Sequence, residues 1–573
     1  MTAMMGAELL LRCLAQEDIH AVFGIPGDQL NPFTDAIARL GPELGVHFYM
    51  TRHEQAAAHM ADAYARVSGK PAVCVGTVGP GAVDLVPGVY PAWADSIPMV
   101  VIAAQNQTWR SYPDHGSSQG LEQIPLFTPI TKWRALVNSR SRIPELVHAA
   151  FRAALSGKPG PVYLEVPSDV MVATAEEDAP PDAPERYRAL TPPAADACLV
   201  EAAARLLVAA ERPLLHAGGG VLRSGAWAEL LALAEYLQAP CTTSIAGRSV
   251  IPEDHPLCLI PSGYGALGAQ AVADTVLLVG GRLGDLDFWG RPPAWGEPGA
   301  QKWIQVDVCP ESIGLNHPVD LALVGDARQV LKQLLEAVRQ LTEQRKGPPP
   351  YFQEALAAQE TWLAGFQEGA CSDAVPIHPL RLMREVRSFF PREAICAVDG
   401  GNTVVWAHYQ NRVYSPRSYL QAADSGHLGV GLPYAIGAQI AAPDRLVYLI
   451  TGDGSFMFNV QELESAVRLG TPVIVVIAND TQWGMIKGGQ KLVYDQRYIG
   501  VDFNDVRFDH VAQAMGCYAE RVTRPAEIRP ALERAVAVRR PAVLDVMVDR
   551  EANLEPPDLC ILDGLWMEGC EVG

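Results

Sequence analysis

The chain has 573 residues, of which 49% are hydrophobic and 19% charged, so it can bury several cores and global disorder is excluded. Its 45 basic and 65 acidic residues give a net charge of −20, which argues against a nucleic-acid or anionic-membrane partner, because either needs a basic footprint. We see no apolar run near the roughly 20 residues of a membrane span and no signal peptide. Eleven cysteines without a CxxC pair fit a reducing compartment, so we expect a cytoplasmic protein.

Short apolar runs alternate with longer helix-like segments along the whole chain. The runs that we expect to be strands are 73–78, 99–104, 162–166, 214–217, 275–279, 303–308, 394–398, 446–450, 473–477 and 543–548. They lack strict alternation of apolar and polar residues, which is typical of strands covered on both faces. The pattern predicts an α/β fold of three doubly wound domains with mainly parallel sheets.

Two segments rich in proline and charged residues, 176–195 and 344–375, are predicted linkers. The predicted units are domains at 1–180, 190–340 and 375–550, and a C-terminal tail at 551–573. The tail is loop-like apart from 561–566.

The segment 446–485 carries the clearest chemical signal. A strand at 446–450 runs into Gly452, Asp453, Gly454 and Ser455, and a helix-like segment at roughly 460–469 leads to a second strand that ends in Asn479 and Asp480. A crossover of this length can bring both acids to one edge of a parallel sheet, where ligands bind.

Two carboxylates at such an edge suit Mg²⁺, which prefers one or two of them together with phosphate oxygens. Gly452 and Gly454 let the backbone come close, and Ser455 and the following helix can donate hydrogen bonds to a phosphate. A tight turn with a solvated acid explains Asp453 alone, but not the spaced second acid. The segment therefore predicts a Mg²⁺–diphosphate site.

GDGS followed by a crossover and an Asn-Asp pair resembles the cofactor motif of thiamine diphosphate enzymes. The resemblance implies metal ligands at Asp453, at Asp480 and at the main-chain carbonyl of Gln482. The family pattern usually ends in Asn-Asn, so Asp480 adds a negative charge. Our hypothesis is that this charge tightens the metal or changes the metal preference.

In this family a glutamate hydrogen-bonds the aminopyrimidine ring of the cofactor and helps to activate it. The segment 51–70 resembles the family segment that carries this residue, and it places Glu54 there, ahead of a glycine-rich loop at 73–86. Taken alone, Glu54 is also explained as an acid that the helix dipole favours in a first turn. Burial against an apolar ring would hold its carboxyl group partly protonated.

Other segments resemble the remainder of the cofactor site. In 425–438, Leu428 stands where the family places an apolar side chain under the bent cofactor, and the Gly426 carbonyl faces its amino group; Leu428 is also explained as a core leucine. In 399–406, Asn402 and Thr403 stand on the diphosphate side. The cofactor-binding residues that the resemblance implies are Gly426, Leu428, Asn402, Thr403, Gly452, Gly454, Ser455, Met485, Ile486 and Thr77.

The resemblance runs from about residue 7 to residue 549, in the order of the acetolactate synthase, pyruvate oxidase and 2-hydroxyacyl-CoA lyase group, and is nearest to acetolactate synthase large subunits. It implies a pyrimidine-binding domain, a central nucleotide-binding-like domain and a diphosphate-binding domain. The central domain of this group often binds FAD or ADP, with Arg282 and Asp307 as candidate contacts here. Because 282–285 reads Arg-Leu-Gly-Asp rather than the Arg-Phe-Asp-Asp of acetolactate synthases, FAD, ADP and no nucleotide all stay open.

The substrate side gives mixed indications. Asp28 resembles the pocket acid of pyruvate decarboxylases, but their His-His pair is missing and His115 is the nearest equivalent. Gln119 and Lys132 resemble acetolactate synthase, whereas the pair 122–123 resembles 2-hydroxyacyl-CoA lyases and oxalyl-CoA decarboxylases. The catalytic residues implied are Glu54, Asp28, Gln119 and His115.

Each of these residues also has a structural explanation. Asp28 fits a turn or helix cap, Lys132 fits a surface or ion-paired lysine, and His115 and His427 fit site and structural roles equally. Lys487 could meet a substrate carboxylate or only solvent. Gly489, which stands where acetolactate synthases have a tryptophan, leaves a wider pocket.

We expect a thiamine diphosphate- and Mg²⁺-dependent lyase or ligase that decarboxylates 2-oxo acids or joins them to a second carbonyl. The alternatives are an enzyme of the 2-hydroxyacyl-CoA lyase or oxalyl-CoA decarboxylase type, with an acyl-CoA substrate, and a non-catalytic nucleotide-binding protein. The resemblance also implies a homodimer or homotetramer, because in this family the glutamate of one subunit meets the metal–diphosphate half of another.

Overall fold

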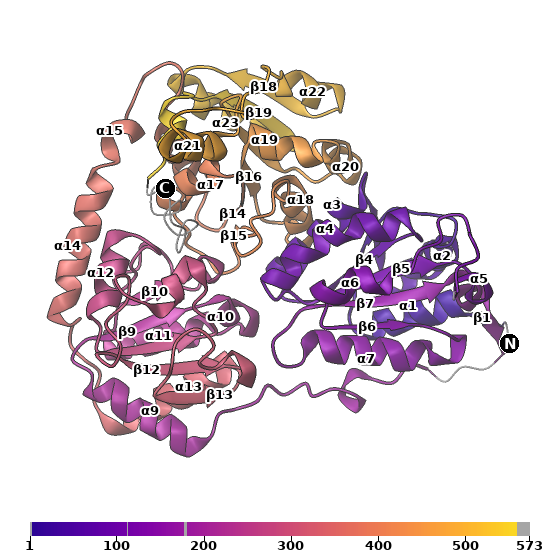
Figure 1. Cartoon of the computed structure of the whole chain (residues 1–573), viewed down its shortest axis with the longest axis horizontal. Coiled ribbons are helices and arrows are strands. Elements are labelled where there is room, and N and C mark those ends of the chain that lie inside the picture. Colours follow the sequence, from indigo (N-terminus) through magenta and orange to yellow (C-terminus); the bar gives the residue numbers. More distant parts are fainter. Residues whose placement is uncertain (1–2, 112, 177–179, 558–573) are drawn as a thin grey trace.

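Three parallel β-sheets organise the chain, and each forms the centre of its own lobe (Figure 1). The computed structural model describes residues 3–111, 113–176 and 180–557. The predicted segment at 561–566, and part of the predicted linker at 176–195, lie outside this range. Among the residues described, no helix combines the length and the apolar character needed to cross a bilayer.

The N-terminal sheet has six parallel strands. In spatial order they are β3 (His47–Met50), β2 (Ala21–Gly24), β4 (Ala72–Gly76), β5 (Met99–Gln105), β7 (Pro161–Pro167) and β6 (Trp133–Leu136). Its helices are α1 (Gly6–Gln16), α2 (Asn31–Leu44), α3 (Glu54–Ser68), α4 (Pro80–Ala94), α5 (Thr108–Ser111), α6 (Ile124–Phe127), α7 (Ile143–Leu155) and α8 (Ser168–Val172). A small antiparallel pair, β1 (Met4–Met5) with β8 (Thr174–Ala175), joins the two ends of this lobe. Every residue of β4, β5 and β7 is buried, as expected for strands with helices on both faces.

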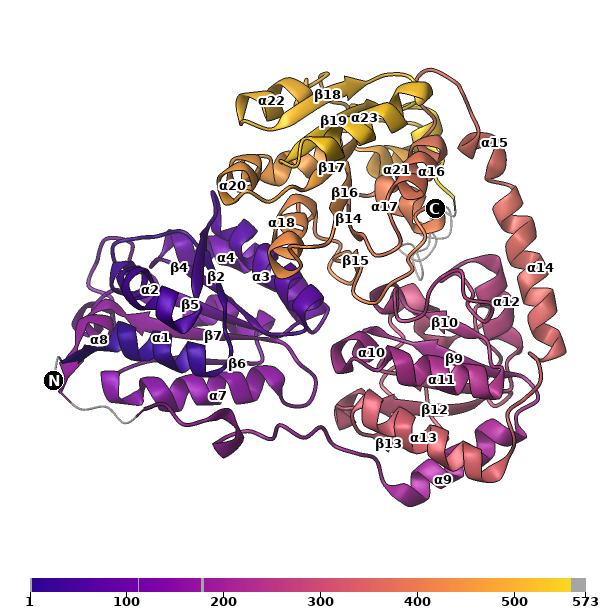
Figure 2. The same ribbon diagram turned by 180° about the vertical axis from the view of Figure 1, so that it is seen from behind.

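The central sheet has five parallel strands. In spatial order they are β10 (Cys241–Thr243), β9 (Pro213–Ala217), β11 (Thr275–Val279), β12 (Lys302–Asp307) and β13 (Leu321–Val324). Its helices are α9 (Ala197–Ala209), α10 (Gly219–Ser224), α11 (Trp227–Leu237), α12 (Tyr264–Val272) and α13 (Ala327–Leu341). Helix α14 (Pro350–Ala364) packs on α12 and, with the short α15 (Gln367–Ala370), leads along the outside of the molecule to the third lobe (Figure 2).

The C-terminal sheet again has six parallel strands. In spatial order they are β15 (Tyr419–Leu420), β14 (Ile395–Asp399), β16 (Val447–Gly452), β17 (Ile474–Asn479), β19 (Ala542–Met547) and β18 (Tyr518–Val522). Its helices are α16 (Pro379–Phe389), α17 (Asn402–Gln410), α18 (Gly431–Ala441), α19 (Asp453–Phe456), α20 (Glu462–Leu469), α21 (Gly484–Val493), α22 (Phe508–Ala514) and α23 (Pro525–Ala537). The three sheets confirm the predicted α/β architecture, whereas the domain boundaries themselves stay predictions.

The N-terminal and C-terminal lobes meet where α3 packs on α18 (Figures 1 and 2). The two helices approach closely because Gly437 has no side chain: a Cβ there would lie 2.3 Å from the Met60 carbonyl oxygen. A buried polar group fixes the contact, since the Tyr434 hydroxyl donates to Asp62, which also pairs with Arg66 at 2.7 Å. The interface therefore fixes the direction of α3, whose first residue is Glu54.

Candidate active site

Each sheet has a topological switch point, where successive connections leave in opposite directions. The chain runs from β14 outward to β15 and returns to β16 on the other side of β14; β2, β3 and β4 repeat this order, as do β9, β10 and β11. Ligands of open α/β sheets bind in the crevice at the carboxyl ends of the strands that flank such a point. Three crevices are therefore defined by the topology alone.

The crevice of the C-terminal sheet holds the two predicted metal-binding acids. Asp453 follows β16 and Asp480 follows β17, and the two strands are parallel neighbours, which confirms the predicted β–α–β unit. Both side chains are buried, and each affects the protonation of the other. Burial, together with Asp480, raises the pKa of Asp453 to about 8, and burial raises the pKa of Asp480 as well. The charge of Asp480 opposes ionisation of Asp453, and two buried carboxyl groups in this relation form a donor set suited to a cation.

The third predicted ligand, Gln482, lies beside this pair. Its side-chain amide donates to Asp480 at 3.0 Å, and the chain reaches it through Thr481, whose φ of +57° is in the left-handed region. Backbone strain of this kind persists only where the surroundings hold it in place, and it often occurs at ligand sites. Here it reverses the chain directly after Asp480.

Asn553, in the segment that follows β19, closes the metal side of the crevice. Its side-chain nitrogen donates to Asp480 at 2.6 Å, its side-chain oxygen accepts from Trp406, and its main-chain carbonyl accepts from Asn402. Asn402 therefore supports the site through Asn553, and its own side-chain oxygen is buried without a hydrogen-bond partner among the residues that the structure describes. We did not predict Asn553, because it lies in a segment without a recognisable pattern.

The glycines of the crevice bring three strand tips together. A Cβ on Gly452 would lie 3.2 Å from the Thr403 hydroxyl, and one on Gly400 would lie 3.3 Å from the Ser455 hydroxyl. Similarly, Gly401 lies against Met485, and Gly454 lies against the ring of Trp483. The predicted diphosphate-side residues Thr403, Gly452, Gly454 and Ser455 thus share one surface.

The predicted cofactor-wrapping loop is held by Asp399, a buried acid at the end of β14. Its carboxylate accepts from the amides of Gly400 (2.7 Å) and Gly431 (2.9 Å), while burial raises its pKa to about 6. Gly426 is exposed with φ of +61°, and Leu428 is half-buried. Leu428 does not belong to a hydrophobic core cluster of the described residues, so a core role does not account for it.

The N-terminal sheet supplies the second part of the predicted site. Glu54 is the first residue of α3 and is 8% exposed. Its carboxyl group lies among His53, Asp84 and Gly81 of the same lobe, and a Cβ on Gly81 would lie 3.0 Å from it. Burial raises the pKa of Glu54, which is the direction required of a carboxyl group that has to hold a proton.

Two other predicted residues lie near this carboxyl group. Thr77 follows β4 and contacts Gly27, beside the exposed Asp28, and its hydroxyl donates to Gln29 at 3.3 Å. Gln119, with φ of +59°, packs on Gly79, the residue that precedes α4. The loops after β2 and β4 thus meet at the switch point of this sheet.

Gln123 anchors the same loop from inside. Its side-chain oxygen accepts from the Gly79 amide at 2.7 Å, while its side-chain nitrogen donates to the Ala104 carbonyl. This buried structural role explains the glutamine of the 122–123 pair, whereas Glu122 is exposed.

Several predicted residues make contacts elsewhere. His115 is exposed in the turn that begins at Asp114, and Ile486 is exposed on α21. Lys132 donates to the carbonyls of Ala153 and Ser156 at the end of α7.

Lys487 and His427 lie at the rim of the C-terminal crevice. Lys487 pairs with Asp502 at 2.7 Å and also donates to Gln482, while Arg550 pairs with the same Asp502 carboxylate, so one acid serves two cations. The ring of His427 interacts with the Leu428 carbonyl and packs edge-on against buried His59 of α3, with ring centroids 5.1 Å apart. His427 thus links the cofactor loop to the interface between the lobes.

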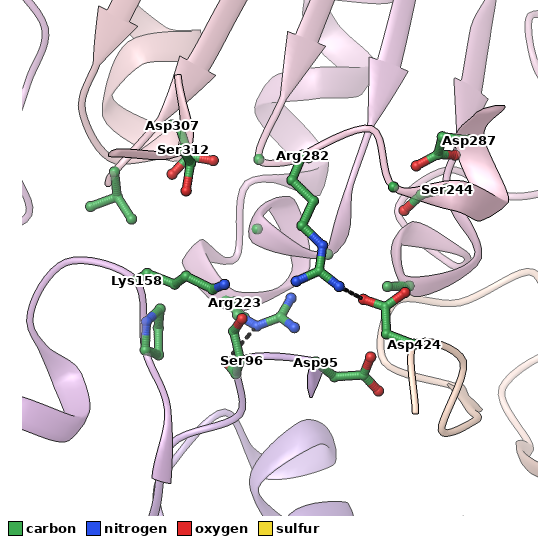
Figure 3. Close-up of a pocket in the computed structure, with 18 of the residues that line it drawn as sticks. Asp95, Ser96, Lys158, Arg223, Ser244, Arg282, Asp287, Asp307, Ser312 and Asp424 are labelled. Carbon is green, nitrogen blue, oxygen red and sulfur yellow. Dashed lines mark hydrogen bonds and ion pairs between the residues drawn. The ribbon is translucent and has the colours of Figure 1, made fainter. Parts of the chain in front are cut away.

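The crevice of the central sheet is an open pocket with an empty volume of about 960 Å³, shared with residues of both other lobes (Figure 3). Gly218 and Gly220 after β9 pack directly on Gly280 after β11, where any Cβ would collide with backbone. The predicted residues Arg282 and Asp307 both line the pocket, and Arg282 pairs with Asp424 at 2.7 Å.

Two cations that we did not predict face this pocket. Lys158 and Arg223 point into the same space, and neither forms a salt bridge within the described part of the chain (Figure 3). Arg223 donates to the Ser96 carbonyl, and burial lowers its pKa to about 10; burial also lowers the pKa of Lys158. Lys158 and Arg223 are thus partly desolvated and without a salt-bridge partner among the described residues, in a pocket also lined by Gly220 and Gly280. Such a pocket fits an anionic ligand with a phosphate group.

Comparison with known proteins agrees with this geometry. Residues 4–126, 200–334 and 399–546 match the N-terminal TPP binding domain, the central domain and the C-terminal TPP binding domain of thiamine pyrophosphate enzymes, respectively. The chain therefore belongs to the enzymes that depend on thiamine pyrophosphate, which is thiamine diphosphate under another name.

Relatives place it in the acetolactate synthase family. A probable acetolactate synthase large subunit of Methanocaldococcus jannaschii is 35% identical, with 95% of this chain and 92% of the relative covered. A glyoxylate carboligase of Escherichia coli is 31% identical (97% and 95% covered), and a probable 2-ketoarginine decarboxylase of Pseudomonas aeruginosa is 36% identical (89% and 88%). The three names differ in their reactions, so the family is fixed while the particular activity is not.

Proposed function

We propose that this enzyme uses thiamine diphosphate and Mg²⁺ to cleave or form a carbon–carbon bond next to the carbonyl of a 2-oxo acid, by decarboxylation, carboligation or both. The observation that carries the proposal is the buried pair of Asp453 and Asp480 at the carboxyl ends of β16 and β17, beside the switch point of the C-terminal sheet. The names of two relatives, a glyoxylate carboligase and a 2-ketoarginine decarboxylase, support 2-oxo acids as the substrate class.

The cofactor, when bound, supplies the electron sink that stabilises negative charge next to the carbonyl carbon. Asp453, Asp480 and the Gln482 carbonyl would hold Mg²⁺, while Ser455 and Thr403 would donate to the diphosphate. Leu428 would support the bent molecule, and Glu54 would hold a proton at its ring nitrogen.

The substrate side is proposed to be wide and accessible. Asp28 and Gln119 are exposed near the Glu54 crevice, and Gly489 leaves space where a large side chain would stand. Lys487 shares the Asp502 carboxylate with Arg550, so this group keeps a net positive charge that a substrate carboxylate could meet. An acyl-CoA substrate has less support, because Gln123 has a structural role.

We propose that a second copy of the chain completes each site, as a homodimer or homotetramer. Glu54 and the acid pair lie in different lobes, and the side chains that approach the Glu54 carboxyl group most directly, His53 and Asp84, come from its own lobe. Both regions also expose apolar side chains, including Tyr90 and Trp93 on α4 and Leu492 on α21. A subunit interface over these faces would bury them.

For the central pocket we propose an adenine nucleotide, FAD or ADP, whose phosphates contact Arg223 and Lys158 and whose ribose contacts Asp307. An absorption spectrum of the purified protein, with analysis of nucleotide released by acid, distinguishes the two. A cytoplasmic location stays a proposal, supported by described cysteines with free thiols such as Cys74, Cys241 and Cys396.

The experiment that tests the main proposal is a substrate panel on protein loaded with thiamine diphosphate and Mg²⁺. We expect turnover of pyruvate, glyoxylate or a larger 2-oxo acid, and none in Glu54→Gln protein prepared identically. Turnover of acyl-CoA thioesters alone would select the alternative. Failure of the cofactor and Mg²⁺ to bind in calorimetry would contradict the proposal altogether.

A further inference from the structure

One acid beside Glu54 has no role in the function proposed above. Asp84 lies on α4, which packs closely against α3 because Gly88 has no side chain: a Cβ there would lie 2.5 Å from the Gln55 carbonyl oxygen. The close packing places the Asp84 carboxylate opposite the start of α3. One ring nitrogen of His53 and one carboxyl oxygen each of Glu54 and Asp84 all lie within 4.8 Å of one another.

The surroundings leave Asp84 free to act on Glu54. The His53 ring accepts from the Gln55 amide as the cap of α3, and its other nitrogen is 3.9 Å from Asp84, too far for a hydrogen bond. The nearby charges of α20 are occupied, since Glu462 accepts from the Arg52 amide and Glu464 pairs with the Arg52 side chain. Asp84 is thus the nearest carboxylate to Glu54 that has no hydrogen-bonded cation among the described residues.

We propose that Asp84 is a positioning residue for catalysis: its negative charge keeps the proton on Glu54. The inference rests on the proposed function, in which Glu54 acts by holding and releasing a proton. A like charge a few ångströms away disfavours the ionised form of a buried carboxyl group. Burial raises the pKa of Glu54 most and Asp84 raises it further, while a hydrogen bond from the backbone amide of Glu54 and the nearby His53 lower it.

The proposed role of Glu54 requires a buried carboxyl group and a negative charge beside it, and a different residue meets each requirement. Glu54 is buried, so its carboxyl group can face an apolar ring, whereas the Asp84 side chain is 44% exposed and keeps its charge in contact with solvent. A single carboxyl group could not meet both requirements. Asp84 contributes through its charge rather than through contact with the reacting atoms.

The test compares Asp84→Asn, which removes the charge and keeps the shape, with Asp84→Glu, which keeps the charge. Asp35→Asn, on α2 of the same lobe, is the control for loss of one surface charge. The first readout is the infrared band of the protonated carboxyl group, assigned by its loss in Glu54→Gln and followed against pH. We expect Asp84→Asn to lower the midpoint by about 0.5–1 pH unit, with Asp84→Glu and Asp35→Asn unchanged.

The second readout uses protein loaded with thiamine diphosphate and Mg²⁺, and needs no substrate. Exchange of the reactive ring proton of the cofactor with deuterium, measured by NMR after acid quench, should show the same downward shift of its pH profile in Asp84→Asn. An unchanged profile and infrared midpoint, or an equal shift in Asp84→Glu, would overturn the proposal. If the wild-type protein shows no exchange at all, the proposed function fails, while the infrared titration still reports on the two carboxyl groups.

Discussion

The two parts of the proposed active site lie at equivalent switch points of two six-stranded sheets, yet they are built differently. In the C-terminal sheet Asp453 and Asp480 are buried, and neighbouring amides and Asn553 hold the second acid in place. In the N-terminal sheet only Glu54 is buried, and Asp28 and Gln119 near it are exposed. On the proposed function, the anchor for the cofactor would be assembled within one lobe, whereas the reacting side would stay open to substrate and to another subunit.

The largest expected effect is the loss of cofactor binding when one of the two buried acids of the C-terminal sheet is replaced. Asp453→Asn would take away a charged ligand of the proposed Mg²⁺, and we expect the affinity for thiamine diphosphate with Mg²⁺ to fall on the order of 100-fold or more. Calorimetric titration measures this loss. Asp444→Asn, an exposed acid of the same lobe, should bind the cofactor as the wild type does; equal weakening in both variants would contradict the role of Asp453.

Replacing Glu54 in the N-terminal lobe should affect turnover rather than cofactor binding. Glu54→Gln keeps the size of the side chain but removes the titrating group, so cofactor binding should persist while turnover falls by about 10²–10⁴-fold. Calorimetry and steady-state rates on one preparation separate the two effects. Retention of full turnover in Glu54→Gln would refute the assignment of the proton-holding role.

The sequence predicted the anchor better than the reacting side, for a physical reason. The residues from Leu446 to Asn479 form two adjacent parallel strands and their crossover, so the distance between the acids follows from local geometry. The contacts of Gln119 with Gly79, and of Asp84 with Glu54, depend on how separate loops and helices pack. No spacing along the chain encodes those contacts.

The strands also divide into those that the sequence predicted and those that it did not. The long apolar strands such as β5 and β11 were predicted nearly to the residue, because burial on both faces leaves a continuous apolar run. Edge strands such as β3 and β15 were not predicted: β3 is short and partly exposed, and β15 has only two residues. Asn553 was missed because its role comes from the return of the chain to the crevice after the last strand.

A smaller effect is expected at that returning segment. Asn553→Ala removes the hydrogen bonds to Asp480 and Trp406 without removing a ligand, and changes of this kind typically lower metal affinity about 10–100-fold. The concentration of Mg²⁺ that half-saturates activity is the measurement, with exposed Asn504→Ala as the control. A loss of turnover at saturating Mg²⁺ would instead mean that Asn553 acts on the reaction itself.

The last prediction concerns the direction in which the thermal stability of the cofactor-free protein changes with pH. Because the pKa of Asp453 in the folded protein is about 8 and its usual value is 3.8, the folded state without metal binds more protons than the unfolded state between these limits, so stability falls as pH rises. Asp399 and Glu462, whose pKa values are also raised, contribute in the same direction, but they are common to the wild type and to Asp453→Asn. Between pH 5.5 and 7.5 the cofactor-free wild type should therefore lose about 2–5 °C more in melting temperature than Asp453→Asn. Mg²⁺ with thiamine diphosphate should abolish this difference, because the cation takes the place of the proton; an equal pH slope in both proteins would show that the two acids do not act as a pair.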